Sequence, residues 1–367
     1  MLAISFFCAG LRIKYFLINF VQTKTNSGDD MKKLILLLML VGVCAAASAQ
    51  QSEKPTPVIF ETDMGNDIDD AIALDLLFKN VDSGKIDLLG VGVHKNNPHS
   101  AEFIDIMRVW YGHEKMPIGV NKKWVTDMEC VDYCTKVCKL TTADGKPMFE
   151  RSKNPKYEDA VTMYRRLLSK AEDKSVVIVT VGFSTTMAEL LQSGADKYSK
   201  LSGRDLVAKK VKFFSVMAGE FEKRNYTEYN VWNDLLAAKY FFDKSPSPMV
   251  ITPFTLGTQV LYPARSIEND FAWAENHPMV EAYKAYDKMP YNRPSWDVIA
   301  AYYVCEHNEA AITLGEPGEV KVVDKGVTHY TPKADGRYRI IQATPEQREL
   351  IVKDFLKYVP MKPANRR

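Results

Sequence analysis

The sequence predicts a single-domain α/β protein with a doubly wound, mainly parallel sheet, C-terminal β-hairpins and a final helix. Two observations support this fold class. Short β-branched runs alternate with segments of helical periodicity along most of the chain. The tail 321–341 instead alternates around Gly326 and the Asp335-Gly336 pair, as hairpins do. Alternation of strands and helices places a parallel sheet between two helical layers, here a Rossmann-like core.

The N-terminal segment is set apart from this fold. Residues 31–49 begin with a methionine and two lysines, continue with the apolar run 34–43, and end at Ala47-Ser48-Ala49. This pattern is typical of a cleaved signal peptide, because the apolar run is too short to span a bilayer. Residues 1–30 precede a complete signal peptide and are interpreted as an upstream start codon taken by mistake. We therefore expect a periplasmic or secreted protein whose folded domain covers 50–367.

Cys44 allows a second interpretation of the signal segment, a lipid anchor on that cysteine. Val43 precedes it, where such sites usually have a small residue, so cleavage without lipidation is favoured. No stretch after the signal peptide is long and apolar enough for a transmembrane helix. Removing 1–49 takes away five basic and two acidic residues, and the formal charge falls from +2 to −1. This balance gives no electrostatic case for nucleic acid or an anionic membrane as partner.

Four cysteines remain after cleavage, and three of them are spaced by four in "CVDYCTKVC". On a helix they would form one stripe. A metal site would need a fourth ligand, and the spacing matches no common zinc pattern. Apolar packing or one disulfide is therefore favoured over metal binding for Cys130, Cys134, Cys138 and Cys305.

The predicted elements follow one another in a regular order. Strands are predicted at 57–60, 86–93, 175–181, 211–217 and 248–253. Helices are predicted at 69–79, 100–112, 157–171, 185–193, 233–244, 296–307 and 345–358. Residues 121–156 are the least regular stretch and are expected to form a surface excursion.

The stretch "ETDMGNDIDDAIAL" follows the first predicted strand and contains Asp63, Asp67, Asp69 and Asp70. In open parallel sheets, ligands collect at the carboxyl ends of the strands. One or two acids at a helix start are ordinary, since the free N–H groups there favour them. Four convergent carboxylates repel one another unless a cation lies among them, and a hard cation such as Ca²⁺ takes oxygen ligands of this kind. The pattern therefore favours a metal site, although the EF-hand spacing is absent.

Four segments, in the same order, resemble the inosine–uridine-preferring nucleoside hydrolases. They are the aspartate-rich stretch, "TVGFSTTMAEL" (180–190), "VMAGEFEKRNYTEYNVWNDLLAAKYFF" (216–242) and "SWDVIAA" (295–301). The resemblance implies a metal-dependent hydrolase of nucleosides on the predicted fold. Family members often form dimers or tetramers, so a homo-oligomer is also implied.

The resemblance assigns roles to particular residues. It implies that Asp63 contacts a calcium ion and acts as general base for the attacking water. Asp70, Asp297 and the backbone carbonyl of Val181 are implied as the other metal ligands. The residues implied to bind the sugar are Asp69, Asn97, Asn225, Glu228 and Asn230.

The sequence departs from the family pattern at two positions. Three residues instead of one separate Gly65 from the Asp-Asp pair, so Asp67 can take a role assigned here to Asp69. Trp296 stands where the family often has the histidine that protonates the leaving base. Tryptophan cannot donate a proton in this way, but it can stack on a nucleobase. Other candidates for the proton donor are His94, Tyr226 and Tyr229.

These observations leave three functional hypotheses. The first is a Ca²⁺-dependent N-ribohydrolase that releases a base from a ribonucleoside. The second keeps the metal and the sugar site but has another ribosyl or sugar glycoside as substrate, which Trp296 motivates. The third is a non-catalytic sugar- or nucleoside-binding protein. Asp63 argues against the third, because a binding protein does not need a base beside the metal.

Overall fold

The computed structural model describes residues 54–123, 132–223, 225–305 and 310–366. Residues Pro55–Arg367 form one compact unit. The signal peptide and the upstream extension lie outside the described residues, so both stay predictions. Within the described residues, no helix has both the length and the apolar character needed to cross a membrane.

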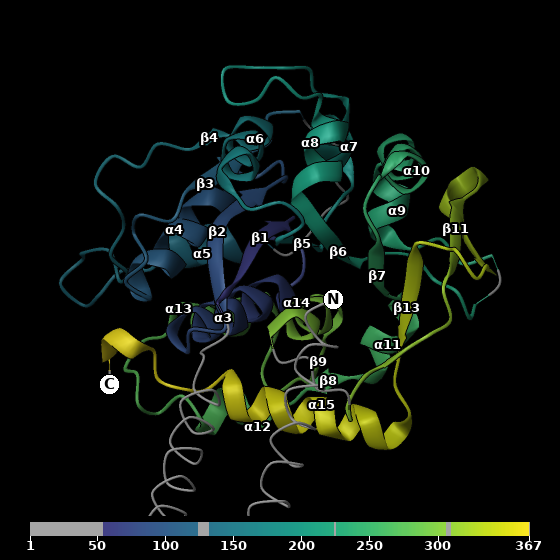
Figure 1. Ribbon diagram of the computed structural model, residues 1–367. Coiled ribbons are helices and arrows are strands. Elements are labelled where there is room, and N and C mark those ends of the chain that lie inside the picture. The colour runs from purple at the N-terminus through teal and green to yellow at the C-terminus, as the bar shows by residue number, and fades with distance from the viewer. Residues whose placement is uncertain (1–53, 124–131, 224, 306–309, 367) are drawn as a thin grey trace, which may run out of the picture. The chain divides into compact units, whose positions relative to one another are not determined.

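The described residues build an eleven-stranded sheet whose centre is parallel (Figure 1). Its order is β12-β11-β13-β7-β6-β5-β1-β2-β3-β4, and β10 pairs with β13. Every neighbouring pair from β4 to β13 is parallel, whereas β10, β11 and β12 pair in antiparallel. The strands of this sheet are β1 (Thr56–Thr62), β2 (Ile86–Val93), β3 (Ile118–Val120), β4 (Glu158–Asp159), β5 (Val176–Thr180), β6 (Val211–Met217), β7 (Met249–Thr252), β10 (Thr313–Leu314), β11 (Gly318–Val322), β12 (Thr328–Pro332) and β13 (Tyr338–Gln342). Two further strands, β8 (Leu261–Tyr262) and β9 (Arg293–Pro294), pair with each other.

The direction of winding reverses at the middle of the sheet. From β1 the chain adds β2, β3 and β4 on one side, and it then returns to place β5, β6 and β7 on the other. Strands β1 and β5 are therefore neighbours at a topological switch point, where open α/β sheets bind their ligands. The predicted doubly wound α/β fold is confirmed.

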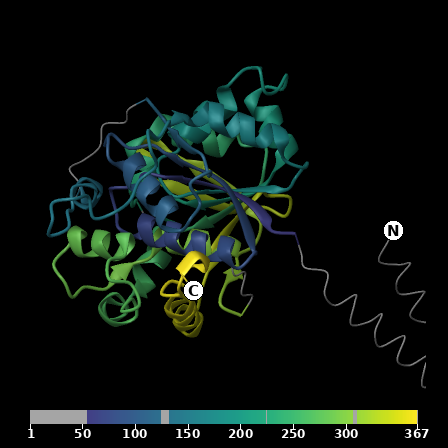
Figure 2. The same cartoon turned by 90° about the vertical axis from the view of Figure 1, so that its left-hand side faces the viewer.

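Helices cover both faces of the sheet (Figures 1 and 2). In Figure 1, α6, α7, α8 and α10 lie above the sheet, and α3, α14 and α15 lie below it. Side chains of β1 alternate between the two cores, with Val58 and Phe60 in one and Ile59 in the other. The described helices are α3 (Asp69–Asp82), α4 (Ser100–Trp110), α5 (Tyr133–Cys138), α6 (Ala160–Lys170), α7 (Thr185–Gln192), α8 (Gly203–Lys210), α9 (Tyr229–Asn233), α10 (Leu235–Lys244), α11 (Phe254–Gln259), α12 (Ala264–Asn269), α13 (Pro278–Tyr286), α14 (Trp296–Cys305) and α15 (Pro345–Tyr358), with 3₁₀ turns at Asp324–Gly326 and Ala364–Arg366.

The C-terminal strands differ in part from the prediction. A hairpin joins β11 and β12 around Gly326, as expected. Strand β13, however, pairs in parallel with β7 and so extends the main sheet. The hairpin residues were visible from local alternation, but the partner of β13 is determined by packing between distant segments.

The irregular stretch 121–156 contains one element that the sequence did not reveal. Helix α5 carries Cys134 and Cys138, and both side chains are buried. Cys134, Cys138 and Cys305 form no disulfide with one another, which agrees with apolar packing of these three side chains. Cys130 lies outside the described residues.

Candidate active site

A pocket opens at the switch point of the sheet. Asp63 directly follows β1, and Val181 directly follows β5. The two strands are in register there, since the Val181 N–H donates to the Glu61 carbonyl at 2.9 Å. The pocket has an empty volume of about 360 Å³. Its lining residues are Asp63, Asn66, Asp67, Asp70, Val181, Met217, Glu228, Tyr229, Asn230, Phe254, Trp296 and Asp297.

The loop 63–68, which we call the acidic loop, is held from behind by α4 and α5. Gly65 has φ of +110°, a conformation that L side chains rarely adopt. The hydroxyl of Tyr133 accepts a hydrogen bond from the Gly65 N–H at 3.0 Å and lies 3.2 Å from the Asp67 carbonyl, to which it donates. Ser100 donates to the Met64 carbonyl at 2.5 Å. These contacts hold the loop in a conformation in which Asp63, Asn66 and Asp67 line the pocket.

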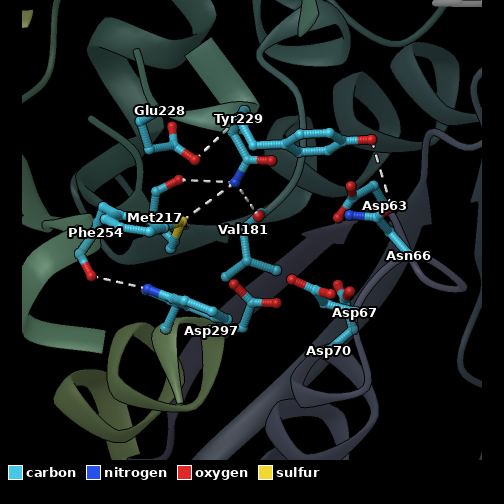
Figure 3. A pocket seen from close by; sticks show the side chains of 12 residues that line it. Asp63, Asn66, Asp67, Asp70, Val181, Met217, Glu228, Tyr229, Phe254 and Asp297 are labelled. Atoms are coloured by element: carbon cyan, nitrogen blue, oxygen red, sulfur yellow. Dashed lines mark hydrogen bonds between the residues drawn. The ribbon is translucent and has the colours of Figure 1, made fainter. Parts of the chain in front are cut away.

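Three carboxylates of the predicted metal site line this pocket (Figure 3). Asp63, Asp70 and Asp297 are 3%, 0% and 5% exposed. Burial raises the pKa of Asp70 well above its usual value, and the nearby charges of Asp63 and Asp69 raise it further. Burial likewise raises the pKa of Asp297, again with neighbouring carboxylates adding to the effect. The pocket therefore holds more negative charge than the positively charged side chains near it can balance.

Asp70 gives the clearest sign that a cation belongs there. Thr62 donates to one of its carboxylate oxygens. The other oxygen, Oδ2, is buried and has no hydrogen-bond partner among the described residues. A buried charged oxygen without a partner is costly, whereas a bound divalent cation would satisfy it. Carboxylates and the Val181 carbonyl are hard oxygen donors, so the residues present fit Ca²⁺.

Asp67 and Asp69 have separate environments. Asp67 lines the pocket, accepts from the Tyr286 hydroxyl at 2.9 Å and forms an ion pair with Arg293 at 2.7 Å. Asp69 is fully buried outside the lining, and its Oδ2 accepts from the Asp297 N–H at 3.0 Å. Burial raises the pKa of Asp69 to about 7, although the nearby Arg293 charge lowers it. Asp69 thus holds the start of α14, while Asp67 faces the pocket; the sugar-binding role predicted for Asp69 stays a prediction.

Helix α9 supplies the wall opposite the acidic loop. The Glu228 carboxylate accepts backbone hydrogen bonds from Gly219, Asn230 and Val231 at 2.9–3.2 Å, which caps α9. The Asn230 amide donates to the Val181 carbonyl at 2.7 Å. This bond fixes the carbonyl predicted as a metal ligand. Glu228 and Asn230 both line the pocket, and the sugar-binding roles predicted for them stay predictions.

Two predicted sugar-binding residues lie outside the lining. The Asn97 amide donates to Asp132 at 2.6 Å, and its oxygen accepts from the His99 N–H at 2.8 Å. Asn225 is exposed and has φ of +62°, which asparagine tolerates better than most residues. Asn97 and Asn225 are not among the residues that line the pocket, and the sugar-binding roles predicted for them stay predictions.

Trp296 lines the pocket, but its one polar atom already has a partner. The indole N–H donates to the Phe254 carbonyl at 2.8 Å (Figure 3). The ring stacks with Phe254 at 5.6 Å between centroids, and the Arg293 guanidinium lies over it at 5.1 Å. A Cβ added at Gly257 would lie 1.9 Å from Trp296 Cδ1, so the indole also packs directly on that glycine. Trp296 is therefore a fixed wall of the pocket.

Sequence reasoning missed several residues of the site. Asn66, Met217 and Phe254 line the pocket. Buried Lys95 donates to the Asn66 side-chain oxygen at 3.3 Å and adds one positive charge behind the acidic loop. A signal was available for Asn66 and Met217, because both lie within the motifs quoted above. Phe254 and Lys95 carry no local signal, since only the fold brings their segments to the pocket.

A different group of ligand-type side chains lies near α4 and α5. His99 Nδ1, Glu102 and Cys138 Sγ lie within 4.8 Å of one another, the one such group of three among the described residues. Its neighbour Arg151 donates to Glu102 and to the Cys138 carbonyl. The guanidinium supplies positive charge to Glu102, and none of the three residues lines the pocket.

Comparison with known proteins agrees with this geometry. The model of the family "Inosine-uridine preferring nucleoside hydrolase" matches residues 58–348. Solved structures with the same fold include a plant nucleoside hydrolase (18% identity, TM-score 0.60, covering 82% of this chain and 99% of that chain) and a purine-preferring ribonucleoside hydrolase from Gardnerella vaginalis (15%, 0.61, 83% and 98%). Another is the type III effector XopQ complexed with adenosine diphosphate ribose (14%, 0.59, 88% and 99%). No curated protein sequence matches this chain.

Fold and family match together define the class of protein, a hydrolase that acts on N-glycosyl bonds. A pocket lined by carboxylates at the switch point suits that chemistry. More narrowly, the chain belongs to the inosine-uridine preferring nucleoside hydrolase family, whose reaction is the hydrolysis of nucleosides. The family match also removes the ground for a purely sugar-binding protein.

Proposed function

We propose that this enzyme is a Ca²⁺-dependent ribonucleoside hydrolase that releases a free base and ribose. One observation carries the proposal. Asp63, Asp70, Asp297 and the Val181 carbonyl line one pocket, and Asp70 Oδ2 is buried without a hydrogen-bond partner among the described residues. Four oxygen donors of this kind suit calcium, which in turn binds hydroxyl groups of a sugar.

The proposed roles follow from position in the pocket. Asp70, Asp297 and the Val181 carbonyl would hold the ion, and Asp63 would touch both the ion and the attacking water. When bound, calcium would help to orient that water and lower its pKa modestly. Asp63 accepts the proton of the water as its oxygen attacks C1′ of the sugar.

The charge that develops on the sugar also needs stabilisation. Cleavage of the N-glycosidic bond produces an oxocarbenium-like sugar in the transition state. Asn230 and Glu228 stand at the wall where ribose hydroxyls would be bound, and Asp67 lies across the pocket from them. We assign a ribose hydroxyl to Asp67 in preference to Asp69, because Asp69 already accepts from the Asp297 N–H outside the lining.

A second candidate function is the hydrolysis of other ribosyl glycosides on the same site. Trp296 favours it, because the indole N–H is bonded to the Phe254 carbonyl and cannot protonate a leaving base. The XopQ structure with bound adenosine diphosphate ribose adds that a protein of this fold accommodates a ribosyl compound other than a nucleoside.

We further propose a periplasmic or secreted location, from the signal pattern at 31–49, and a homo-oligomer as one form of the enzyme. We propose neither nucleic acid nor a membrane as a partner of the protein once the signal peptide is cleaved. Mature protein in an oxidising compartment would also meet millimolar calcium more readily than cytosolic protein does.

A riboside panel tests the main proposal. Mature protein is incubated with inosine, adenosine, uridine and cytidine, with calcium or with a chelator, and free base is measured. Asp63→Asn serves as the control for the general base, with circular dichroism to verify its fold. Base release that survives both the chelator and Asp63→Asn would overturn the proposal.

A further inference from the structure

The pocket offers no efficient proton donor for a leaving group. Among the described residues that line it there is no histidine, lysine, arginine or cysteine. The indole N–H of Trp296 is committed to the Phe254 carbonyl. The Tyr229 hydroxyl lies 3.4 Å from the Asn66 side-chain oxygen, to which it donates, and a phenol is a weak acid near neutral pH.

The charge of the pocket is strongly negative. Five carboxylates line it, and Asp69 lies directly behind them. The cations nearby are Arg293, paired with Asp67, Lys95, which donates to Asn66, and Lys223, whose ammonium lies 4.9 Å from the centroid of the Phe254 ring. With a divalent ion bound as well, the positive charges still do not match six carboxylates. A substrate that carries a positive charge is therefore favoured over a neutral or anionic one.

Aromatic rings stand in the same pocket as these carboxylates. Phe254, Trp296 and Tyr229 line it, and Tyr226 stacks on Phe254 at 4.6 Å between centroids. Aromatic faces attract cations, and carboxylates in the same pocket exclude anions. Acidic and aromatic groups together suit a flat, cationic ring.

We propose that the preferred substrates are N-ribosyl pyridinium compounds, ribosides whose leaving group is a positively charged aromatic ring. The inference rests on the proposed N-ribohydrolase function and narrows its substrate class. In the step, the oxygen of water bonds to C1′ while the C1′–N bond breaks. The bonding electron pair neutralises the pyridinium nitrogen, and the water's proton passes to Asp63. The departing ring leaves neutral and requires no proton, so a site without a donor is sufficient for it.

The experiment compares substrates of equal shape and different charge on wild-type holoenzyme. Nicotinamide riboside is the cationic probe. Its reduced 1,4-dihydro form is the matched neutral control, inosine and uridine are neutral nucleosides, and nicotinamide mononucleotide adds an anionic phosphate. Because pyridinium ribosides are also more reactive without enzyme, each rate is divided by the uncatalysed rate, and affinity is measured separately as KM or Ki.

We expect nicotinamide riboside to be hydrolysed with kcat/KM at least about 100-fold above that of inosine and to bind at least about tenfold more tightly than its dihydro form. Its KM should rise with ionic strength, because charge contributes to binding. The profile of kcat/KM against pH should fall only at low pH, where the general base becomes protonated, and should show no second fall at high pH from loss of a general acid. We also expect Phe254→Leu to weaken binding of the cation more than that of the dihydro form.

Three other outcomes are decisive in different ways. If inosine or uridine is hydrolysed efficiently while nicotinamide riboside is not, the substrate inference is overturned and the proposed N-ribohydrolase function stands. If no riboside releases its base, with calcium present, both fall. Equal affinity for nicotinamide riboside and its dihydro form at every salt concentration would also overturn the inference, because charge would then play no part in recognition.

Discussion

The guanidinium of Arg293 lies 2.7 Å from the carboxylate of Asp67, and the two residues are separated by 226 positions in the chain. The same guanidinium lies over the rings of Tyr286 and Trp296, at 4.8 and 5.1 Å. Arg293 thus joins the acidic loop to the start of α14, two of the segments that carry proposed metal ligands. One internal cation both orients Asp67 and offsets part of the local negative charge.

Replacing Arg293 should separate these two effects. Arg293→Gln removes a positive charge near the proposed ion, so we expect Ca²⁺ to bind up to about tenfold more tightly. Asp67 is then no longer held, so kcat/KM should fall. Calorimetry of Ca²⁺ binding and riboside kinetics measure the two changes. Arg293→Lys keeps the charge and is the control, with calcium affinity expected near that of the wild type. Weaker calcium binding in Arg293→Gln would contradict this account.

Removal of calcium should make stability depend on pH in a definite direction. Without the ion, burial raises the pKa values of Asp69, Asp70 and Asp297 above the unfolded value of 3.8, to about 7 for Asp69. The folded protein then binds protons that the unfolded chain releases, so stability is greatest below the unfolded pKa and is lost as pH rises through the folded one. We expect the Tm of chelated protein to fall from pH 5 to pH 8.

The effect of added calcium should run the other way. Ca²⁺ replaces those protons, so the rise in Tm on adding it should be larger at pH 8 than at pH 5. Asp70→Asn removes one ligand and should reduce the rise at pH 8. A rise of equal size at both pH values, measured by calorimetry, would show that these carboxylates do not hold the ion.

The acidic loop should depend on Tyr133. Tyr133→Phe leaves the Gly65 N–H without its acceptor, and the free energy of unfolding should fall by about 1–3 kcal/mol. Calcium affinity should fall with it, since the loop that carries Asp63 is loosened. Denaturant unfolding and calcium titration measure both. Tyr330→Phe, which removes an exposed hydroxyl on β12, is the matched control and should change neither.

Gly257 and Trp296 should be energetically coupled. A Cβ at 257 would lie 1.9 Å from the indole, so Gly257→Ala should lower the free energy of unfolding by about 1–3 kcal/mol. When Gly257→Ala is combined with Trp296→Ala, the added methyl group has room. The double variant should therefore lose less free energy of unfolding than the sum of the two single losses. Gly194→Ala, with open space around its Cβ, is the control. Additive losses would mean that the glycine serves another purpose.

The sequence was sufficient for most of the fold. Strands 86–93 and 211–217 and helix 345–358 have the predicted bounds, because their hydrophobic periodicity is strong and their ends carry turn or capping signals. Helix α5 and the short helices between β7 and α14 were missed. They have few turns, and their hydrophobic faces depend on neighbours that local patterns do not reveal.

Part of the site was predictable from the order of the elements. Asp63 follows the first predicted strand, and ligands collect at the carboxyl ends of parallel strands. Val181 was implied only by the family resemblance, and its place in the same pocket follows from the pairing of β1 with β5. The different environments of Asp67 and Asp69 were not predictable, because Arg293 reaches both from a distant segment. The sugar-binding roles implied for Asn97 and Asn225 stay predictions.

The fit of Trp296 against Gly257 also has an evolutionary meaning. An indole at 296 is compatible with glycine at 257 and collides with any larger residue there, so the two positions are expected to covary among homologues. A relative with histidine at position 296 would be free of this constraint at position 257. The identities at the two positions together therefore form a two-site sequence signature by which family members can be sorted.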